Sequence, residues 1–383
     1  MSLRDVIVQR IASGPLPFAE YMELALYHPE LGYYARGDQR SGRAGDFFTS
    51  VDVGSLFGEF LAVQIAEMWQ VLKTHSVDAS HIDLVEAAAG NGRLSRDLLD
   101  AMAAHHTDLY DAAGLTLVER SPAARAAQVA TLTPHLAKLQ HSMESLPSQV
   151  SGVIFANELL DAMPVHPVVM TDSGLREVYV TTEGPDSEGL VERLGAPGPD
   201  VLDHVERFGI DLEPGWRAEV SPEMVGWVES AGSSLDRGFL IVIDYGHEAN
   251  ELYSATHATG TLTTYQQHVV RSHGAANSGT PPWLEEPGEA DITAHVDLTA
   301  VRLSAEAAGM QTLAVVDQTY FLLGLGADHM SEPDDPVSAL RRRLALKTLL
   351  VPGGLGSTHK VMIFGKNVGH PELKATGFSH RAT

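Results

Sequence analysis

The sequence has 383 residues, of which 44% are apolar and none is cysteine. At roughly 150 residues per domain this length predicts two or three domains, or one enlarged domain, and the lack of cysteine excludes disulfides, thiolate metal sites and a cysteine nucleophile. The 26 basic residues against 50 acidic ones leave a net charge of −24, which repels phosphate backbones and predicts that nucleic acid is not a partner.

The segment from Met1 to Arg10 lacks the basic stretch and apolar run of a signal peptide, and also the Arg- and Ser-rich character of a transit peptide. No stretch approaches the roughly 18 consecutive apolar residues of a membrane-spanning helix. Together with the missing cysteines, these features predict a cytoplasmic protein that does not insert into a membrane.

Helices separated by turns are predicted near the start of the chain. Their apolar spacing and their Gly and Pro stops indicate helices over Leu3 to Ile11, Phe18 to Tyr27 and Leu56 to Leu72. The loop at residues 37–52 between the last two is rich in Gly, Asp and Ser. We predict a helical N-terminal subdomain with a lid loop over residues 1–75.

Strand and helix patterns then alternate. Apolar runs predict strands at Ile82 to Glu86, Leu115 to Glu119, Val153 to Ala156 and Phe239 to Asp244, and helical patterns cover Leu94 to Ala104 and Pro122 to Leu132. This alternation predicts an α/β core with a parallel sheet over residues 76–164 and 233–366. Ligands of such sheets bind beyond the carboxyl ends of the strands.

An insertion interrupts this core over residues 165–232. Two strands, Val168 to Met170 and Glu177 to Thr181, flank a turn, and a Gly-, Pro- and acid-rich stretch at 183–200 predicts a loop. We expect this region to form an α+β cap on the sheet. Residues 367–383 are polar and predict a flexible tail.

The stretch from Leu84 to Gly92 is the most informative motif. A buried strand ends in Glu86, a run of small residues (Ala88, Gly90 and Gly92 among them) follows, and a helix then begins. Small residues let a ligand approach the backbone, but an acid beside the turn repels a pyrophosphate. The motif suits S-adenosylmethionine, which carries an ammonium and no phosphate; the alternative is a tight turn without a ligand.

The second strand also ends in an acid, Glu119, in a position to accept hydrogen bonds from ribose hydroxyls. Its alternative role is that of an acidic residue at a helix N-terminus. After the next strand, Asn157, Glu158 and Asp161 form a polar group, in which the two carboxylates would share a face of a helical turn. They could bind a cationic acceptor and take its proton, or simply cap a helix.

These motifs, taken in chain order, resemble the MidA-type methyltransferases, a family that includes the mitochondrial protein arginine methyltransferases of complex I assembly. The resemblance rests on matching motifs at residues 21–34, 45–50, 118–122, 156–166, 243–246, 260–268, 291–297 and 360–365. It implies an α/β fold: a class I Rossmann-like methyltransferase sheet with a helical N-terminal subdomain and an inserted α+β cap. It also implies that the cofactor is S-adenosyl-L-methionine and the product S-adenosyl-L-homocysteine.

The resemblance also implies roles for individual residues. The cofactor-binding set comprises Glu86, Ala88, Gly90, Gly92, Glu119, Ser142, Met143, Asn157, Thr49 and Ser50. Within this set, Ser142 and Met143 fall where the family meets the adenine. The catalytic candidates come from the residues themselves, since an arginine acceptor requires a carboxylate: they are Glu158 and Asp161, with Asp46 in reserve. Two alanines, at 88 and 89, replace the Gly-Pro that is usual in the family's first turn.

No metal site is predicted. The 18 histidines include no His-Glu-x-x-His pattern. His295 and Asp297 could form a metal pair, but the residues before them favour the start of a helix.

The predicted activity is methyl transfer to an arginine of a protein partner, with a basic protein or peptide segment attracted by the acidic surface. The alternatives are a methyltransferase of a small molecule or peptide, a cofactor-binding assembly chaperone without essential methyl transfer, and, on the glycine turn alone, a nicotinamide-dependent oxidoreductase. The oligomeric state stays open, with a homodimer as one option.

Overall fold

The structure, a computed structural model, describes residues 1–35, 49–74, 80–184, 187, 189–266, 269–272, 279–329, 334–351 and 355–381. The chain divides into two compact units. Unit 1 comprises Met1–Phe47, Leu160–Trp227 and Gly246–Val301, and unit 2 comprises Phe48–Leu159, Val228–Tyr245 and Arg302–Thr383. Among the described residues, the helices are too short or too polar to cross a bilayer.

Unit 2 is built on a mostly parallel sheet. Its strands are β2 (Ile82–Ala87), β3 (Ala113–Val118), β4 (Leu139–Met143), β5 (Val150–Asn157), β10 (Leu235–His247, whose last two residues belong to unit 1), β15 (Gln311–Asp317) and β16 (His359–Lys366). Within the described residues their order is β15-β16-β10-β5-β2-β3-β4, and only β16 runs antiparallel to its neighbours.

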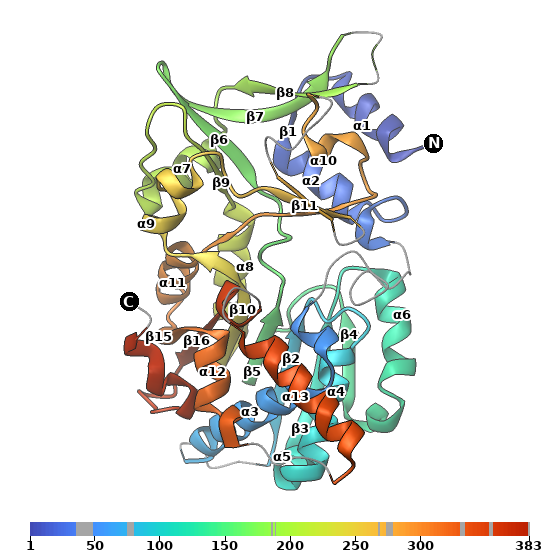
Figure 1. The fold of residues 1–383 in the computed structure, drawn as a ribbon, viewed down its shortest axis with the longest axis vertical. Helices are drawn as coiled ribbons and strands as arrows, with labels where there is room; N and C mark the ends of the chain where they lie inside the picture. Colours follow the sequence, from blue (N-terminus) through green and yellow to red (C-terminus); the bar gives the residue numbers. More distant parts are fainter. Residues whose placement is uncertain are drawn as a thin grey trace. The chain divides into compact units, whose positions relative to one another are not determined.

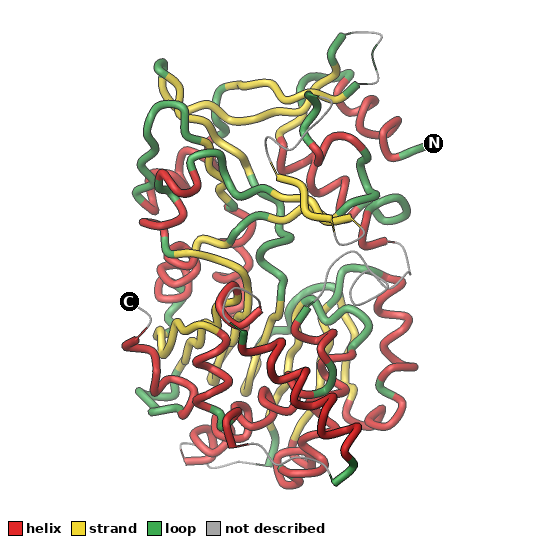
Figure 2. Tube along the Cα trace, viewed as in Figure 1, coloured by secondary structure: helices red, strands yellow, loops and turns green. Residues whose placement is uncertain are grey.

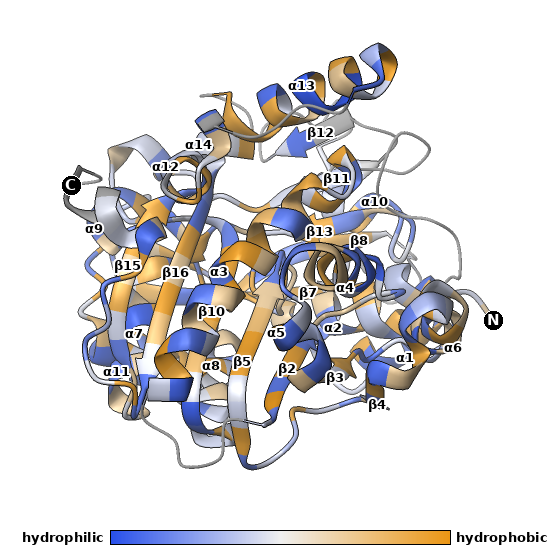
Figure 3. Ribbon diagram, turned by 90° about the horizontal axis from the view of Figure 1, so that it is seen from below, coloured by the Kyte–Doolittle hydropathy of each residue, from blue (hydrophilic) through white to orange (hydrophobic). Residues whose placement is uncertain are grey.

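The first five of these strands along the chain lie side by side in the order 3-2-1-4-5 of a doubly wound fold. The chain adds strands on one side of β2 up to β4 and then on the other side from β5 onward, so the strand order reverses between β2 and β5. The predicted α/β sheet is therefore confirmed. Its strands are apolar on both faces because both are covered: Phe239 to Ile243 of β10 are all buried, and apolar colours dominate the strands in Figure 3. The reversal point is where ligands of such sheets bind.

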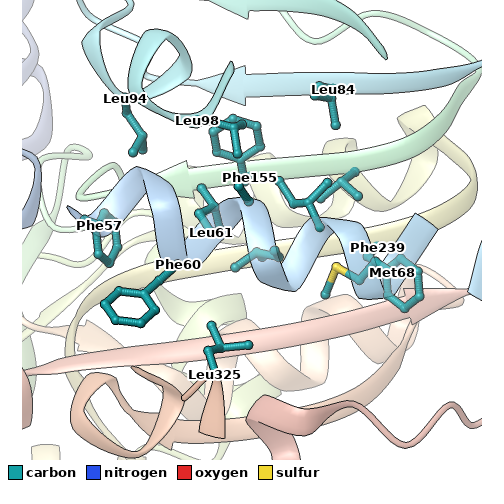
Figure 4. Close-up of a cluster of buried hydrophobic side chains, with 14 of the residues drawn as sticks. Phe57, Phe60, Leu61, Met68, Leu84, Leu94, Leu98, Phe155, Phe239 and Leu325 are labelled. Atoms are coloured by element: carbon teal, nitrogen blue, oxygen red, sulfur yellow. The ribbon is translucent and has the colours of Figure 1, made fainter. Parts of the chain in front are cut away.

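Helices cover this sheet (Figure 2). They are α3 (Leu56–Thr74), α4 (Arg93–His105), α5 (Thr107–Ala112), α6 (Pro122–Thr131), α12 (Gln318–Gly324), α13 (Pro336–Leu350) and α14 (Leu355–Thr358). The apolar side chains of α3 pack among residues of the strands and of α4. The residues of this buried cluster that Figure 4 labels are Phe57, Phe60, Leu61, Met68, Leu84, Leu94, Leu98, Phe155, Phe239 and Leu325. Gly58 lets α3 approach α4, since a Cβ there would lie 2.9 Å from the Asp97 Cβ.

Unit 1 contains an antiparallel sheet. Its elements up to residue 220 are α1 (Leu3–Ile11), β1 (Leu16–Pro17), α2 (Phe18–Tyr27), β6 (His166–Thr171), β7 (Gly174–Thr182), β8 (Leu190–Gly195), α7 (Pro199–Phe208) and β9 (Arg217–Val220). In the described residues the strands are ordered β1-β7-β6-β9, and β8 pairs with β7 (Figure 1). The predicted hairpin around residues 172–174 is thus present.

The remaining elements of unit 1 are α9 (Ala249–Leu252), β11 (Thr263–Gln266), β12 (Val269–Ser272), α10 (Pro282–Glu285), β13 (Asp291–Thr293) and β14 (Val296–Asp297). Two helices, α8 (Pro222–Ser234) and α11 (Leu298–Ala307), begin in unit 1 and end in unit 2. The short 3-10 helices are η1 (Tyr33–Ala35), η2 (Ser50–Val53), η3 (Thr133–Lys138), η4 (Ala255–His257), η5 (Ala327–His329) and η6 (Lys374–Arg381).

One apolar core joins α1 and α2 to the sheet of unit 1. Phe18 and Tyr21 of α2 are buried together with Val180 of β7 and Trp283 of α10. The sequence-based division, with boundaries at residues 75, 164, 232 and 366, assigns α1 and α2 to one domain and strands β6 to β9 of the sheet of unit 1 to another. That division stays a prediction about which parts fold independently.

Three local expectations differ from the structure. The stretch at 183–200 contains a strand, β8, because Leu190 packs in the core and the strand extends the sheet at β7. The segment after Lys366 is anchored rather than loose, since Leu373 and Ala375 are buried in the core of unit 2. Residues 158–165 form bends and turns in place of the expected helical turn.

Candidate functional site

The bend between β2 and α4 combines small residues with left-handed backbone. Ala88, Gly90 and Gly92 have φ of 54°, 51° and 82°, a region that non-glycine residues rarely adopt. A Cβ at Gly90 would meet no atom within 4 Å, whereas one at Gly92 would lie 3.1 Å from Leu117 Cδ1. Gly90 therefore leaves the backbone approachable, and Gly92 serves the packing of the helix start.

Glu86, at the end of β2, is an almost fully buried acid. Its carboxylate accepts a hydrogen bond from the Ser95 hydroxyl of α4. Burial raises the pKa of Glu86 to about 8, against the effect of the Ser95 bonds, and the negative charges of Glu119 and Asp97 raise it further. The raised pKa favours the protonated form of Glu86, and a cation beside it would favour loss of that proton.

Glu119 follows β3 and binds the glycine bend. Its Oε2 accepts from the Gly90 N–H at 2.9 Å, and its Oε1 accepts from the Ser121 N–H at 2.7 Å. Its own N–H donates to the Met143 carbonyl at 2.8 Å. The structure thus brings together four residues that the sequence singled out: Glu86, Gly90, Glu119 and Met143.

Sequence reasoning missed Gln128 of α6, which is fully buried. Its Nε2 donates to the Gly90 carbonyl at 2.8 Å, and its Oε1 accepts from the Ser142 hydroxyl at 2.6 Å. This side chain joins the bend to β4, where the predicted adenine contacts lie. The residue type gave no signal, because glutamine is common on helices. The only available hint was its position ten residues after the end of β3.

Thr49 and Ser50 are occupied by bonds within the protein. The Thr49 N–H and hydroxyl both donate to Asp52 Oδ2 at 3.0 Å, and the Ser50 hydroxyl donates to Gln318 Oε1 at 3.0 Å. Asp52 in turn pairs with Arg93, the first residue of α4. These bonds tie η2 to the helix that follows the glycine bend, and a direct role of the two hydroxyls in cofactor binding stays a prediction.

Glu158 lies at the centre of a polar cluster after β5. Its Oε1 accepts from Asn157 Nδ2 at 3.0 Å and lies 3.5 Å from His359 Nε2, and its Oε2 accepts from the Tyr245 hydroxyl at 3.1 Å. His359 is fully buried and packs against Tyr245 with the two rings tilted by 47° and their centroids 4.1 Å apart. Tyr245 and His359 come from β10 and β16, so sequence spacing could not have shown them.

The backbone at Glu158 is left-handed, with φ of 53°. Its N–H donates to the Ile243 carbonyl at 2.8 Å, and the next N–H, of Leu159, donates to Asp244 Oδ2 at 3.1 Å. Ala88 and Glu158 are two of four non-glycine residues with positive φ in the described part of the chain, and they follow neighbouring strands. Such strain clusters at functional sites.

Asn157 carries an unsatisfied acceptor. Its Oδ1 is buried and finds no hydrogen-bond donor among the described residues. Buried polar atoms normally have partners, so this oxygen is suited to a donor from a ligand.

Asp161 does not share a helical face with Glu158, because the intervening residues are bent and Asp161 belongs to unit 1. It is buried, and its carbonyl accepts from the Ala294 N–H at 3.0 Å. The reserve candidate Asp46 lies outside the described residues.

Comparisons with known proteins agree with this geometry. Residues 60–316 match the family described as "Putative S-adenosyl-L-methionine-dependent methyltransferase". A solved structure from Burkholderia thailandensis, described as a "likely methyl transferase" bound to S-adenosyl-homocysteine, is 30% identical with a TM-score of 0.86, over 98% of this chain and 95% of that one.

Curated relatives point the same way. The zebrafish (Danio rerio) protein arginine methyltransferase NDUFAF7, mitochondrial, is 29% identical over 85% of this chain and 76% of its own length. The human relative of the same name is 27% identical over 85% of this chain and 73% of its own length.

The predicted cytoplasmic location is wrong by this comparison, because the curated relatives from fish to human are named mitochondrial. The absence of cysteine suits more than one compartment, so composition could not decide the location.

The sheet order, the glycine bend with its two acids, and the matched family together identify the activity and the cofactor. The nicotinamide-dependent alternative is set aside. The chain belongs to the family of S-adenosyl-L-methionine-dependent methyltransferases that its residues 60–316 match.

Proposed function

We propose that this chain transfers a methyl group from S-adenosylmethionine to a guanidinium nitrogen of an arginine in a protein partner. The observation that carries the proposal is Glu158, a partly buried carboxylate at the end of β5 that accepts hydrogen bonds from Asn157 and Tyr245 and lies 3.5 Å from His359 Nε2. The names of the curated relatives, protein arginine methyltransferases, support the same acceptor.

The residues of the bend fit the donor. When bound, S-adenosylmethionine supplies an electrophilic methyl group on a sulfonium, together with an ammonium, a ribose diol and an adenine, but no phosphate. We assign the ammonium to Glu86 and the ribose hydroxyls to Glu119, because both are strand-end acids at the glycine bend. Ala88, Gly90 and Gly92 shape this bend, and Gly90 leaves room for close approach.

We assign the adenine and the surroundings of the methyl group to three further residues. Ser142 and Met143 of β4 contact the adenine, and the unsatisfied Oδ1 of Asn157 accepts a hydrogen bond near the methyl-transfer centre. Thr49 and Ser50 support this site from η2 through their bonds to Asp52 and Gln318.

Glu158 orients the acceptor and takes its proton. A guanidinium has a pKa above about 12, so it must lose a proton as one of its nitrogens gains the methyl carbon. The carboxylate would hold the guanidinium by charge-assisted hydrogen bonds and accept that proton as the nitrogen–carbon bond forms and the bond from the methyl carbon to sulfur breaks. S-adenosylhomocysteine would leave with the electron pair of the broken bond, and the carboxylate would pass the proton to solvent. Tyr245 and His359 lie against this carboxylate. Asp161 is the other candidate for the proton-accepting role, with Asp46 in reserve.

The net charge of −24 favours a basic protein segment as the acceptor. The test incubates the purified chain with methyl-labelled S-adenosylmethionine and arginine-rich peptides, and with matched peptides in which lysine replaces every arginine. Mass spectrometry should find methylarginine in the first set alone.

Three other results would overturn the proposal. Label found only on lysine, or only on small molecules, would assign a different acceptor. Donor binding without transfer to any acceptor would support the chaperone alternative.

A further inference from the structure

Three histidines that are distant in the sequence meet in unit 1. His247 ends β10, His257 ends η4, and His295 lies between β13 and β14. Each offers a ring nitrogen, and the three nitrogens lie within 4.8 Å of one another. The ring centroids are 4.8 Å (His247 to His257), 5.1 Å (His247 to His295) and 5.9 Å (His257 to His295) apart.

One residue, Glu251, orients two of these rings. His247 Nδ1 lies 3.1 Å from the Glu251 carboxylate, and His257 Nδ1 lies 3.0 Å from the Glu251 backbone carbonyl. Because a carbonyl oxygen can only accept, His257 Nδ1 carries the proton and Nε2 has the lone pair of the neutral ring. Histidines that ligate metals characteristically donate their second N–H to a carboxylate or a backbone carbonyl.

The backbone around the third histidine is also fixed. The His295 N–H donates to Thr261 Oγ1 at 3.0 Å, and the preceding Ala294 N–H donates to the Asp161 carbonyl at 3.0 Å. Parallel pairing of β10 with β14 places His247 opposite Asp297, two residues after His295. Contacts that do not depend on a ligand therefore orient the rings of His247 and His257 and fix the backbone that carries His295.

We propose that His247, His257 and His295 bind one transition-metal dication, with zinc as the best-suited ion. Imidazole nitrogens suit zinc, copper, iron and nickel, and three histidines with solvent as the fourth ligand form a known type of zinc coordination. His295 is exposed and the other two are half-buried, which leaves the fourth position open to water.

The metal site demands only a small closure. Zinc–nitrogen bonds of about 2.0–2.1 Å in tetrahedral geometry place ligand nitrogens roughly 3.3 Å apart. Nitrogens that already lie within 4.8 Å reach this spacing by side-chain rotation. Asp297 takes no part, because it accepts from the Tyr253 hydroxyl at 3.0 Å and from the Ala300 N–H at 3.0 Å at the start of α11.

The bound ion would link the end of β10 to η4 and to the segment between β13 and β14. It shares no residue with the proposed methyl-transfer site, so the two proposals stand or fall separately. Its first effect is on the stability of unit 1, since binding to the folded state alone stabilises that state.

The test titrates zinc chloride into the full chain, freed of any affinity tag and treated with a chelator, and follows binding by calorimetry. We expect one zinc ion per chain that survives desalting, and a rise in melting temperature. Cobalt in place of zinc should give the visible absorption bands of tetrahedral coordination.

Variants locate the site. His257→Ala should weaken zinc binding at least about tenfold, and His247→Ala/His257→Ala/His295→Ala should abolish the stoichiometric site. Glu251→Ala keeps all three ligands but removes the carboxylate behind His247, and we expect roughly 10-fold to 100-fold weaker binding. The matched control, His105→Ala/His370→Ala, removes two exposed histidines elsewhere and should bind as the wild type does.

Folding of each variant is checked by circular dichroism and by S-adenosylmethionine affinity, both of which should match the wild type. Wild-type protein that binds no stoichiometric zinc would overturn the proposal. Equal zinc affinity in the wild type and the His257→Ala variant would do the same, because zinc would then be bound elsewhere.

Discussion

Two pairs of carboxylates, one in each compact unit, have different kinds of partner. In unit 1, Glu177 meets His166 at 2.7 Å, and Glu192 holds Arg217 through two bonds of 2.7 and 2.9 Å. In unit 2, Glu86 and Glu119 accept from a hydroxyl and from backbone N–H groups. The first arrangement pairs each acid with a basic side chain, and the second bonds each acid to neutral donors.

This difference separates structural acids from binding acids. A buried charge is costly unless it is paired, so a fold keeps an unpaired acid chiefly where a ligand compensates it. The raised pKa of Glu86 expresses that cost, since burial and the nearby acids disfavour the ionised form. A bound donor with an ammonium beside Glu86 would offset this cost of ionising the carboxylate.

The largest effect is expected for Glu158→Gln, which tests whether Glu158 belongs with the acids that serve binding and catalysis. The amide keeps the shape of the side chain but cannot accept the proton, so methyl transfer should slow by roughly 10²- to 10⁴-fold while donor affinity stays within about twofold. Single-turnover transfer and donor calorimetry measure the two quantities. Glu213→Gln, at an exposed position in unit 1, is the control, and unchanged turnover in Glu158→Gln would remove Glu158 from catalysis.

The next largest effect is expected for donor binding. Glu119→Ala removes the acceptor for two backbone N–H groups and for the ribose, and should raise the donor Kd by roughly 10- to 100-fold. Glu158→Ala should raise it far less, because that carboxylate faces the acceptor. Equal donor affinities in the two variants, measured by calorimetry, would contradict the division of roles.

A third prediction uses the pKa of Glu86, which is about 8. Below that value the group is protonated, and a bound ammonium favours its ionised form, so donor binding releases a proton. The donor Kd should therefore fall by up to about tenfold per pH unit as the pH rises toward 8 and then level off.

Glu86→Gln should make this pH profile flat. Calorimetry in two buffers with different ionisation enthalpies counts the released protons. A wild-type affinity that does not change with pH would argue against an ammonium beside Glu86.

The smallest effect is expected in unit 1, from the paired His166. Although burial lowers it, the hydrogen bonds that His166 donates to the Glu177 and Glu223 carboxylates raise the pKa of His166 from 6.5 to about 9. The contribution of protonated His166 to the free energy of unfolding is therefore fully present below pH 6.5 and is lost as the pH rises through about 9. The pKa of Glu177 is lowered despite its burial, because His166 and the Gly198 N–H bond it, so its share is lost only in acid.

His166→Gln should lower the free energy of unfolding by about 1 kcal/mol near neutral pH and by little at high pH. Denaturant melts across this pH range measure the difference. A constant gap between the two proteins at all pH values would show that the ion pair does not stabilise unit 1.

Much of the sheet could be predicted from local sequence. Strands such as Phe239 to Ile243 are apolar throughout because both faces are covered, and a strand-end acid followed by small residues marks the bend at Gly90. The MidA-type resemblance carried the family and the cofactor. Location could not be predicted in the same way, because composition does not encode it.

The partners within the site could not be predicted. Ser95, Gln128, Tyr245 and His359 belong to four different elements, and residues of these types are common on any helix or strand. The turn after β5 was expected to be helical. Hydrogen bonds from Glu158 and Leu159 to β10, more than 80 residues away, hold it in a left-handed bend instead.

The amino-acid order alone determined the alternation of strands and helices, the acids at two strand ends, and the small residues between them, since these depend on neighbours in the chain. Only tertiary structure decided that Glu119 would bind the N–H of Gly90, that His359 would reach Glu158, and that three histidines would share one corner of unit 1. The physical reason is that a distance between residues far apart in sequence is set by which apolar faces pack together, and no local pattern records it.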